Sequence, residues 1–399
     1  MEKPKSHQKK LTFEERYQLE CEFLLENIED LVDTTPEQKP LKTKVLYPNG
    51  YKPAYDVLDP DPRPTQVGRY KIMRKIGKGS SGVVYAGLMP GKSERNDTVA
   101  IKRLPYTSNQ YQTQTGYKTA AYSRSTTLRE LYNNIRLQNA NQYIVKFVEL
   151  LHSDEADYLV MPYYERSLNI YFGPLHSVTN SAFHIRALLK GILLGVSHIH
   201  RCNMIHRDLK PDNIMLREDG SPVIIDLGLC RERGVHQNKA YSNEVQTAGY
   251  RPPEIVLGAR RYGPSIDIWS VGIIFVEILL RQRVMPLIPD FKTRMAAELA
   301  TMVHTVQYFN PNAPIPLSFY QLPDFSAFEV LYAKRETVGR DNSSRFHQLS
   351  NGAKDLIGKM LDIDPERRIT AEDALNHEFI SPKPYVSAFR TFIEVPDSD

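Results

Sequence analysis

The sequence predicts an α+β protein, and three neighbouring segments carry this prediction. Tyr70–Ile76 reads as a strand that enters a glycine-rich turn, G-K-G-S-S-G, and Val83–Ala86 reads as the returning strand. A further strand, V-A-I-K, follows at Val99–Lys102, where β-branched residues dominate. The segment S-T-T-L-R-E-L at 125–131 then reads as a helix. Strands joined to a helix in this order place the N-terminal half in the mixed class.

Length and composition set bounds on the rest of the chain. A chain of 399 residues corresponds to two or three units of ordinary domain size, and 41% hydrophobic residues suffice for a sizeable core. Lysine and arginine (51) nearly balance aspartate and glutamate (47), giving a formal charge of +4. Such a mild excess does not indicate nucleic acid as a partner.

The cysteines and the apolar runs point to a soluble intracellular protein. Cys21, Cys202 and Cys230 are scattered and form no C-x-x-C pair, so neither a disulfide framework nor a zinc site is indicated. The most apolar run, Val271–Leu280, includes Glu277 and is shorter than the ~20 residues that cross a bilayer. The first residues, M-E-K-P-K-S-H-Q-K-K, lack the apolar core of a secretory signal. We expect neither membrane anchoring nor export.

Residues 1–66 read as an N-terminal extension. Thr12 and Glu15 have the spacing of a capping box, and an amphipathic helix is predicted to follow them. Many prolines between Pro36 and Pro64 then indicate a linker or a segment that lies along another surface. The apolar face of the helix fits either a partner chain or the protein's own globular part, and amphipathicity alone does not separate the two.

The stretch His206–Asn213, H-R-D-L-K-P-D-N, carries the most specific chemistry in the chain. Asp208 stands two residues before the ammonium of Lys210 and five before the amide of Asn213, in a loop that Pro211 keeps from becoming helix. A carboxylate can orient and deprotonate a hydroxyl, an ammonium can neutralise a phosphoryl group, and an amide oxygen can hold Mg²⁺. The stretch therefore predicts phosphoryl transfer, against the alternative of an ordinary polar loop.

The glycine-rich turn and Lys102 fit the same chemistry. A G-x-G-x-x-G pattern alone is weak, because it also occurs in dinucleotide-binding units and in plain tight hairpins. Here a strand follows the glycines, which favours a hairpin that covers nucleotide phosphates. Lys102 then becomes a phosphate ligand, and Glu130 on the following helix is placed to pair with it.

Two segments between these motifs are also informative. Pro105–Ser125 is rich in Tyr, Thr, Gln and Ser and reads as an exposed insertion. Tyr158–Val160 reads as an apolar strand that ends at Met161, and the crossing to Tyr164 predicts a hinge whose backbone meets an adenine ring. Pro162 in this hinge has no N–H but keeps a carbonyl acceptor.

In its ordered motifs the chain resembles the eukaryotic protein kinases from about Val67 to about Ile380. D-L-G at Asp226–Gly228 stands where the family usually has D-F-G, and R-P-P-E at Arg251–Glu254 resembles A-P-E. Arg368 in D-P-E-R-R-I-T matches the arginine that pairs with that glutamate, and D-I-W-S-V-G resembles a core helix of the large lobe. The form K-P-D-N is typical of serine/threonine kinases.

The resemblance implies a bilobal kinase fold with ATP and Mg²⁺ between the lobes. The small lobe, 67–161, is expected to be a five-stranded antiparallel sheet with one main helix; the large lobe, 162–380, is expected to be mostly helical, and 381–399 is a tail. The expected catalytic residues are Asp208, Lys210, Lys102 and Glu130, and Asn213 and Asp226 are the expected metal ligands. The expected nucleotide-binding residues are Ile76, Gly77, Gly79, Gly82, Val84, Ala100, Lys102, Met161, Tyr164 and Met215.

Several segments are similar to the cyclin-dependent branch of the CMGC group. S-T-T-L-R-E resembles the cyclin-binding signature P-S-T-A-I-R-E, which implies a cyclin partner that pushes the helix inward to complete the Lys102–Glu130 pair. By the same resemblance Arg129, Arg207 and Arg231 gather around a phosphorylated Ser242, the alternative being an unmodified loop serine. Arg251 matches the arginine that favours proline after the phosphorylated residue. The branch also implies a nuclear location.

A subset of features leans toward the Mediator-associated cyclin-dependent kinases, with cyclin C as the candidate partner. These features are the N-terminal helix, the lengthened loop before V-A-I-K, the D-L-G motif and the proline-bearing tail. Ser242 speaks against this subgroup, which generally has no phosphorylatable residue there.

Departures from the family pattern keep a second class of function open. Leu227 replaces phenylalanine, Gly249 stands in place of tryptophan, and Pro252 replaces alanine. Asn134 stands where the family places a leucine of an apolar stack, and burying its amide without a partner costs about 1–3 kcal/mol. These residues motivate a weakly active or pseudokinase-like scaffold that acts by protein binding, although the catalytic set is complete. A small-molecule kinase fits less well, because the R-P-P-E segment is typical of kinases that act on protein substrates.

Overall fold

The computed structural model describes residues 64–79, 82–91, 97–105, 121–138, 141–153, 156–172, 182–233, 246–284, 294–311, 313–326, 328–329 and 349–382. These residues belong to two compact units. The first contains the described residues up to Asn169 and those of 198–233, and the second contains 170–172, 182–197 and those from 246 onward. The predicted N-terminal helix, most of the predicted insertion, Ser242 and most of the tail lie outside the described residues.

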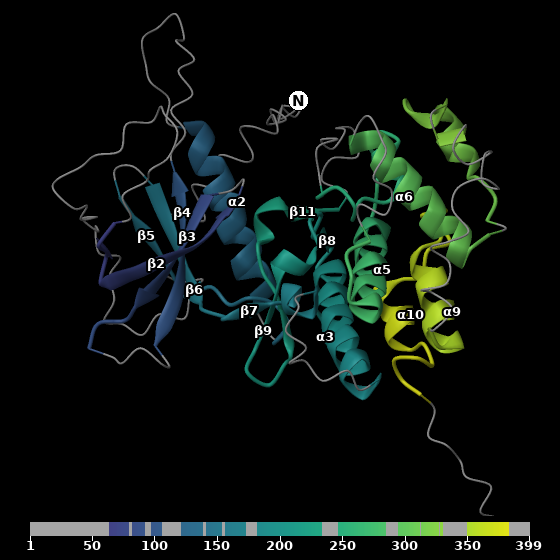
Figure 1. The fold of residues 1–399 in the computed structure, drawn as a ribbon. Coiled ribbons are helices and arrows are strands. Elements are labelled where there is room, and N and C mark those ends of the chain that lie inside the picture. Colours follow the sequence, from purple (N-terminus) through teal and green to yellow (C-terminus); the bar gives the residue numbers. More distant parts are fainter. Residues whose placement is uncertain are drawn as a thin grey trace, which may run out of the picture. The chain divides into compact units, whose positions relative to one another are not determined.

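The first unit is built on an antiparallel sheet with the strand order β1-β2-β3-β4-β6-β5 (Figure 1). Its strands are β1 (Gln66–Val67), β2 (Tyr70–Gly79), β3 (Gly82–Leu88), β4 (Thr98–Pro105), β5 (Glu149–His152) and β6 (Ala156–Pro162). The sheet thus has six strands instead of the predicted five. The additional strand, β1, has two residues and pairs at the edge with Tyr70 and Lys71 of β2, which is too short to leave an alternating pattern in the sequence.

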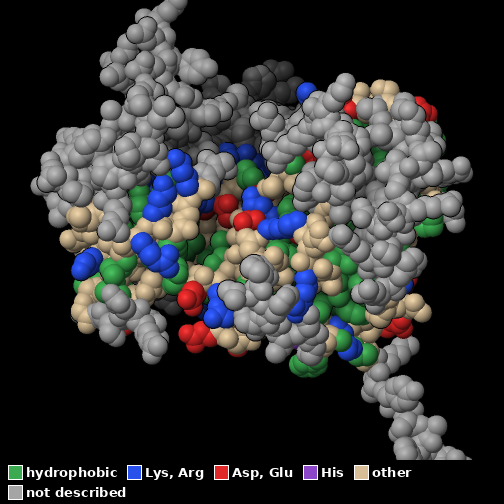
Figure 2. All heavy atoms as spheres, in the orientation of Figure 1, with side chains coloured by type: hydrophobic (Ala, Val, Ile, Leu, Met, Phe, Trp, Pro, Cys, Tyr) green, Lys and Arg blue, Asp and Glu red, His purple; other side chains and the backbone are tan. Residues whose placement is uncertain are grey.

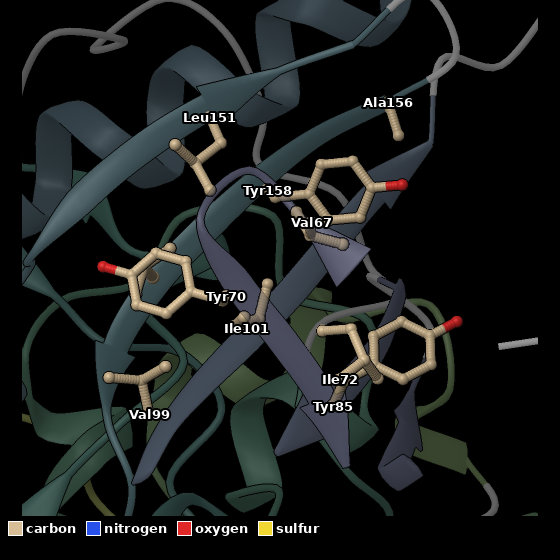
Figure 3. Close-up of a cluster of buried hydrophobic side chains, with 10 residues drawn as sticks. Val67, Tyr70, Ile72, Tyr85, Val99, Ile101, Leu151, Ala156 and Tyr158 are labelled. Atoms are coloured by element: carbon tan, nitrogen blue, oxygen red, sulfur yellow. The ribbon is translucent and has the colours of Figure 1, made fainter. Parts of the chain in front are cut away.

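One face of this sheet holds an apolar core (Figure 3). Tyr85, Ile101 and Tyr158 come from three neighbouring strands, and each is fully buried. Successive side chains of a strand point to opposite faces, so the neighbours of these three residues along each strand face the other side of the sheet. The whole cluster consists of Val67, Tyr70, Ile72, Tyr85, Val99, Ile101, Leu151, Ala156, Tyr158 and Val160.

The other face packs in part against the helix α2 (Ala121–Gln138). Leu131 of this helix lies in one buried cluster with Leu104 of β4 and Leu159 of β6. The helix begins at Ala121, so the last residues of the predicted insertion are helical. Packing through Leu131 fixes α2 to the sheet and hence fixes where Glu130, its neighbour, is presented.

Short strands follow the sheet in the first unit. β9 (Ile214–Leu216) pairs with β10 (Pro222–Ile224) and with β7 (Arg166–Ser167), whereas β8 (Met204–Ile205) pairs with β11 (Arg231–Glu232). These pairings hold the loop 206–213 and the D-L-G segment at the ends of two small sheets.

The second unit is helical in its described part. Its helices are α4 (Pro253–Val256), α5 (Ser265–Leu280), α6 (Arg294–Phe309), α9 (Asn351–Met360) and α10 (Ala371–Leu375), together with residues 182–197 of α3 (Ala182–Arg201). α5, which contains Asp267 and Trp269, is buried almost throughout, as predicted for a core helix. At Gly272 a Cβ atom would lie 2.8 Å from the Leu361 side chain, so glycine permits α5 to approach the end of α9.

The apolar helix α3 and the charged side chains of the surface both bear on the sequence predictions. α3 is long and apolar enough to cross a membrane by length and composition, but more than half of it is buried within the protein. Its buried residues include Leu188, Leu189 and Ile192, so we interpret α3 as a core helix. Figure 2 shows lysine and arginine side chains interspersed with hydrophobic, polar and acidic ones on one face.

Candidate active site

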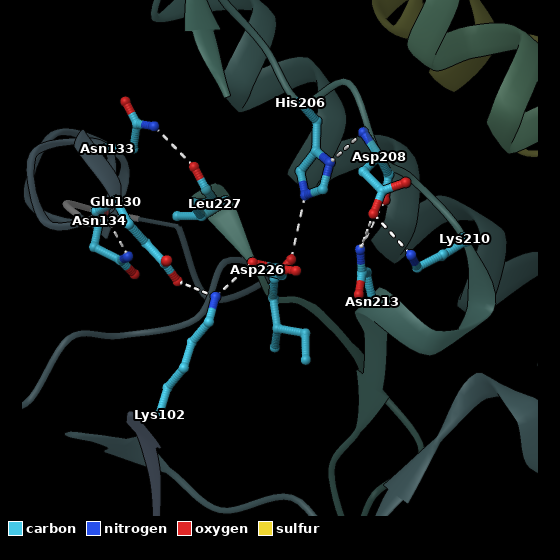
Figure 4. Close-up of polar contacts among 11 residues, drawn as sticks. Lys102, Glu130, Asn133, Asn134, His206, Asp208, Lys210, Asn213, Asp226 and Leu227 are labelled. Carbon is cyan, nitrogen blue, oxygen red and sulfur yellow. Dashed lines mark hydrogen bonds and ion pairs between the residues drawn. The ribbon is translucent and has the colours of Figure 1, made fainter. Parts of the chain in front are cut away.

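Lys102, Glu130 and Asp226 meet in the first unit (Figure 4). Nζ of Lys102 lies 2.6 Å from Oε1 of Glu130 and 2.8 Å from Oδ1 of Asp226. Lys102 and Glu130 are buried, 5% and 3% exposed. The Lys102–Glu130 pair predicted from the sequence is therefore formed, and Asp226 joins it.

One ammonium facing two carboxylates leaves this cluster with an excess negative charge. Burial lowers the pKa of Lys102, but attraction to Glu130 and then to Asp226 outweighs it and raises the pKa overall. Burial raises the pKa of Asp226, but the Lys102 ammonium outweighs it and the net pKa is lowered. Asp226 is thus held as a carboxylate at neutral pH, the state in which it can bind a cation.

The backbone around Asp226 explains how the side chains come so close. Asp226 has φ 59° and ψ 71°, in the left-handed region, and a 3-10 turn, Leu227–Leu229, follows. At Gly228 a Cβ atom would lie 3.1 Å from Oε2 of Glu130 and 3.5 Å from Oδ1 of Asp226. The glycine therefore leaves room for the Glu130 carboxylate beside this turn.

The loop after β8 fixes Asp208 from several sides. Nζ of Lys210 donates to Oδ2 of Asp208 at 2.8 Å, and Nδ2 of Asn213 donates to the same oxygen at 3.0 Å and to the Asp208 carbonyl at 2.9 Å. The Asp208 N–H donates to Nδ1 of His206 at 3.2 Å, which leaves the proton of that ring on Nε2, and Nε2 lies 3.2 Å from the Ile225 carbonyl oxygen. The loop thus assembles three of the predicted residues, Asp208, Lys210 and Asn213.

Asn213 and Asp226 lie at the same end of the β9–β10 hairpin. Ile214 pairs with Ile224, and the Ile225 N–H donates to the Asn213 carbonyl at 2.9 Å. Because Nδ2 of Asn213 donates both of its hydrogen bonds to Asp208, the side-chain amide oxygen is the Asn213 atom that can bind a ligand. An amide oxygen and a carboxylate are the donors that Mg²⁺ prefers, and the excess negative charge beside them fits a cation.

The sheet face that carries Lys102 also carries predicted nucleotide contacts. Ala100 and Lys102 alternate with Ile101 and therefore share one face of β4. Val84 is paired with Lys102, and Met161 is paired with Ala100, so both present their side chains on that face. Ala100 carries only a methyl group next to the lysine and is 8% exposed.

The glycine-rich turn closes the hairpin between β2 and β3. Gly79 pairs with Gly82, and Gly77 pairs with Val84. Gly82 has φ 140°, and a Cβ atom there would lie 2.0 Å from the carbonyl oxygen of Arg103, so only glycine fits. At Gly77 the nearest atom that a Cβ would meet among the described residues is the Cβ of Val84, at 4.0 Å. Ile76 precedes it on β2 and is half-buried.

The remaining predicted nucleotide contacts lie at the end of β6, just after it and in β9. β6 continues to Pro162, paired with Val99, one residue beyond the predicted end at Met161. Tyr164 follows half-buried, and burial raises the pKa of its phenol. Met215 lies in β9, where it pairs with Ser167.

Two asparagines on α2 occupy positions that the sequence left in doubt or passed over. Nδ2 of Asn134 donates to the Glu130 carbonyl at 2.8 Å, so this buried amide finds a partner within its own helix. Asn133 received no role from the sequence. Its Nδ2 donates to the carbonyls of Leu227 and Cys230, at 2.8 and 3.2 Å. The only sequence signal was its position three residues after Glu130, which places both on one helix face.

The predicted phosphate-binding arginines are described, whereas Ser242 lies outside the described residues. Arg207 has φ 70° and is 3% exposed. Arg231 pairs with Ile205, close to Arg207 in the chain. Arg129 is half-buried on α2. The gathering of the three around Ser242 stays a prediction.

In the second unit, Arg251 fixes a strained turn. Its Nε donates to the Gln246 carbonyl at 3.0 Å, and Gln246 has φ 67°, rare for a residue other than glycine. Glu298 of α6 lies 3.7 Å from Nη1 of Arg251 and accepts the Gly249 N–H at 3.0 Å. The turn and its arginine are thus held from α6.

Fold and site together fit a phosphotransferase, because a buried lysine is paired with two carboxylates and a loop aspartate is held by a lysine and an asparagine. The sequence pattern of the protein kinase domain family matches residues 70–380. The chain belongs to this family, as predicted.

Among curated proteins, cyclin-dependent kinase 12 of Caenorhabditis elegans is 31% identical over 318 residues, which is 79% of this chain and 41% of that protein. The chain thus spans less than half of the relative's length. This similarity supports the predicted cyclin-dependent branch of the serine/threonine kinases.

Proposed function

We propose that the chain transfers the γ-phosphate of ATP to serine or threonine residues that precede proline in protein substrates, together with a cyclin-type partner. The observation that carries the catalytic part is the complete set of contacts described above: Lys102 with Glu130 and Asp226, and Asp208 with Lys210 and Asn213. Retention of the whole set in bonding geometry favours turnover over a purely structural role.

Each residue then has one task. The Asp208 carboxylate, held by Lys210 and Asn213, orients the substrate hydroxyl and accepts its proton. Lys102, kept protonated by its carboxylate partners, holds the nucleotide phosphates, and Glu130 keeps its ammonium in place. Asn213 and Asp226 would hold Mg²⁺, which when bound supplies charge neutralisation at the phosphate oxygens.

The preference for proline is supported by the turn at Gln246. The Gln246 carbonyl accepts a hydrogen bond from Nε of Arg251. It therefore points toward Arg251 and does not accept a hydrogen bond from a backbone N–H of the substrate peptide. A residue with a free N–H would leave that donor unpaired, at a cost of about 1–3 kcal/mol, whereas proline has no N–H to lose.

The proposed partner chain and cellular location rest on the similarity to the cyclin-dependent kinases. α2 carries S-T-T-L-R-E, and the name of the similar nematode protein describes a cyclin-dependent kinase. We propose a cyclin-type subunit, with cyclin C as the candidate from the lean toward the Mediator-associated kinases, a nuclear location, and a role in transcription or cell-cycle control.

The decisive experiment compares the chain with Asp208→Asn in the presence of a candidate cyclin. We expect phosphorylation of a Ser-Pro peptide by the wild type and a loss of about 10²-fold to 10⁴-fold in kcat for the variant. Undiminished activity of the variant would remove Asp208 from the mechanism. Nucleotide binding without phosphate transfer would favour the scaffold that Asn134, Leu227 and Gly249 suggested.

A further inference from the structure

A buried carboxamide spans the turn that follows Asp226. Asn133 is 2% exposed, and its Nδ2 donates to the carbonyls of Leu227 and Cys230, the residues at the two ends of that turn. The Cys230 N–H closes the same turn by donating to the Leu227 carbonyl at 3.1 Å. One side chain of α2 therefore bonds the turn at both ends.

These bonds complete a closed ring of contacts (Figure 4). Glu130 and Asn133 lie three residues apart on one face of α2. Glu130 bonds Lys102, Lys102 bonds Asp226, and the turn after Asp226 returns to Asn133. Displacing α2 or the turn alone breaks contacts on two sides of the ring, so each part keeps the others in place.

A second bond from the next helical turn acts in the same direction. Arg136 donates to the Cys202 carbonyl at 3.1 Å and pairs with Glu232 of β11 at 3.0 Å. The side chains of this pair are about one-third exposed, so it is weaker than the buried amide bonds. It nevertheless anchors the same helix to the segment that follows D-L-G.

We propose that Asn133 is a positioning residue that holds Asp226 and Glu130 in register with Lys102 without any partner chain. This inference rests on the proposed function, in which Asp226 is a ligand of Mg²⁺. It departs from the mechanism implied by the family resemblance, in which a cyclin pushes the helix inward. In this chain the inward position is stabilised from within.

The test uses the 399-residue chain without a cyclin, as wild type, Asn133→Leu and Asn134→Leu. Asn134 is the matched control, because it is an adjacent buried asparagine whose Nδ2 donates to the carbonyl of Glu130 in its own helix. Hydrogen exchange of 226–232 is measured without nucleotide. The Mg²⁺ concentration for half-maximal binding of a fluorescent ATP analogue is measured next, and peptide phosphorylation last.

We expect Asn133→Leu to accelerate exchange in 226–232 and to raise the required Mg²⁺ concentration about 10-fold to 100-fold, the range for a residue that orients a metal ligand. Asn134→Leu should change neither. Equal exchange and equal Mg²⁺ dependence in wild type and Asn133→Leu would overturn the proposal. If Asn133→Leu does not fold, Asn133→Ala removes the same bonds without added bulk.

The exchange measurement also separates this inference from the proposed function. A wild-type chain that binds nucleotide but phosphorylates no peptide even after a candidate cyclin is added would contradict the kinase activity, whereas protection of 226–232 that depends on Asn133 would still support the positioning role.

Discussion

Arg368 and Glu254 stand 114 residues apart in the chain and form two parallel hydrogen bonds, Nη1 to Oε1 at 2.8 Å and Nη2 to Oε2 at 3.1 Å. Both side chains are buried, and the guanidinium also lies over Trp269 of α5, 5.2 Å from the ring centroid. This pair, expected from the family resemblance, ties α4 to the segment before α10 in the second unit.

Replacing Arg368 with methionine should lower the free energy of unfolding by about 3–5 kcal/mol, because it leaves the Glu254 carboxylate buried without its partner. Urea denaturation measures the change. Arg367→Met is the matched control, since the side chain of that neighbouring arginine is 46% exposed and pairs with Asp362. Its replacement should lower the free energy of unfolding by only about 0–1 kcal/mol. Equal losses in both variants would contradict this account.

Replacing Arg251 with methionine should relax the preference for proline. The substitution releases the Gln246 carbonyl, so the ratio of kcat/KM for Ser-Pro over Ser-Ala peptides should fall about tenfold, the equivalent of one lost hydrogen bond. Arg260→Met, at an exposed arginine nearby, should leave the ratio unchanged. A constant ratio in the Arg251 variant would exclude this arginine from peptide selection.

Gly228→Ala should reduce activity through contact with Glu130. The added Cβ atom would lie 3.1 Å from Oε2 of Glu130, so the carboxylate must shift away from its position against Lys102. We expect kcat/KM to fall about tenfold, a loss of 1.4 kcal/mol of transition-state stabilisation. Gly263→Ala is the control, because a Cβ atom there meets nothing within 4 Å. Full activity of Gly228→Ala would show that Glu130 tolerates the displacement.

Tyr70 should make stability depend on pH in alkali. Burial, together with the hydrogen bond to Glu149, raises the pKa of its phenol from 10.0 to about 12. A pKa that is higher in the folded state means that this contribution to stability is complete below about pH 10 and is lost as the pH rises through 12. The stability difference between wild type and Tyr70→Phe should therefore shrink from pH 9 to about pH 12. Urea denaturation at both values measures it, and a constant difference would contradict the shifted pKa.

The sequence predicted those features that residue type alone signals. Lys102 and Glu130 belong to motifs that fix their order, and alternation along β4 follows from V-A-I-K, so their meeting was foreseeable. Asn133 was not, because a single asparagine on a helix is usually solvated, and only the fold brings the carbonyls of Leu227 and Cys230 to it. Its role is set by tertiary contacts that leave no local pattern.

Backbone geometry marks a second limit of the sequence. Gly82 could be predicted to need special freedom, because only glycine tolerates φ 140° against a neighbouring carbonyl. Gln246 adopts φ 67° with no sequence signal, since the strain is compensated by Arg251 and by the bond from its own Nε2 to Ser270 at 3.1 Å. The start of α2 at Ala121 was missed for a similar reason, because Ser and Tyr have modest helix propensity.

The ring through Asn133 also has a consequence for inhibitors. A small molecule that requires the Leu227–Leu229 turn to swing away from α2 must first break both carboxamide bonds, and its apparent affinity falls with the rarity of that opened state. A molecule that lies flat on Val84 and Ala100 disturbs none of these bonds. This kinase should therefore discriminate between the two chemotypes through a residue that neither of them touches.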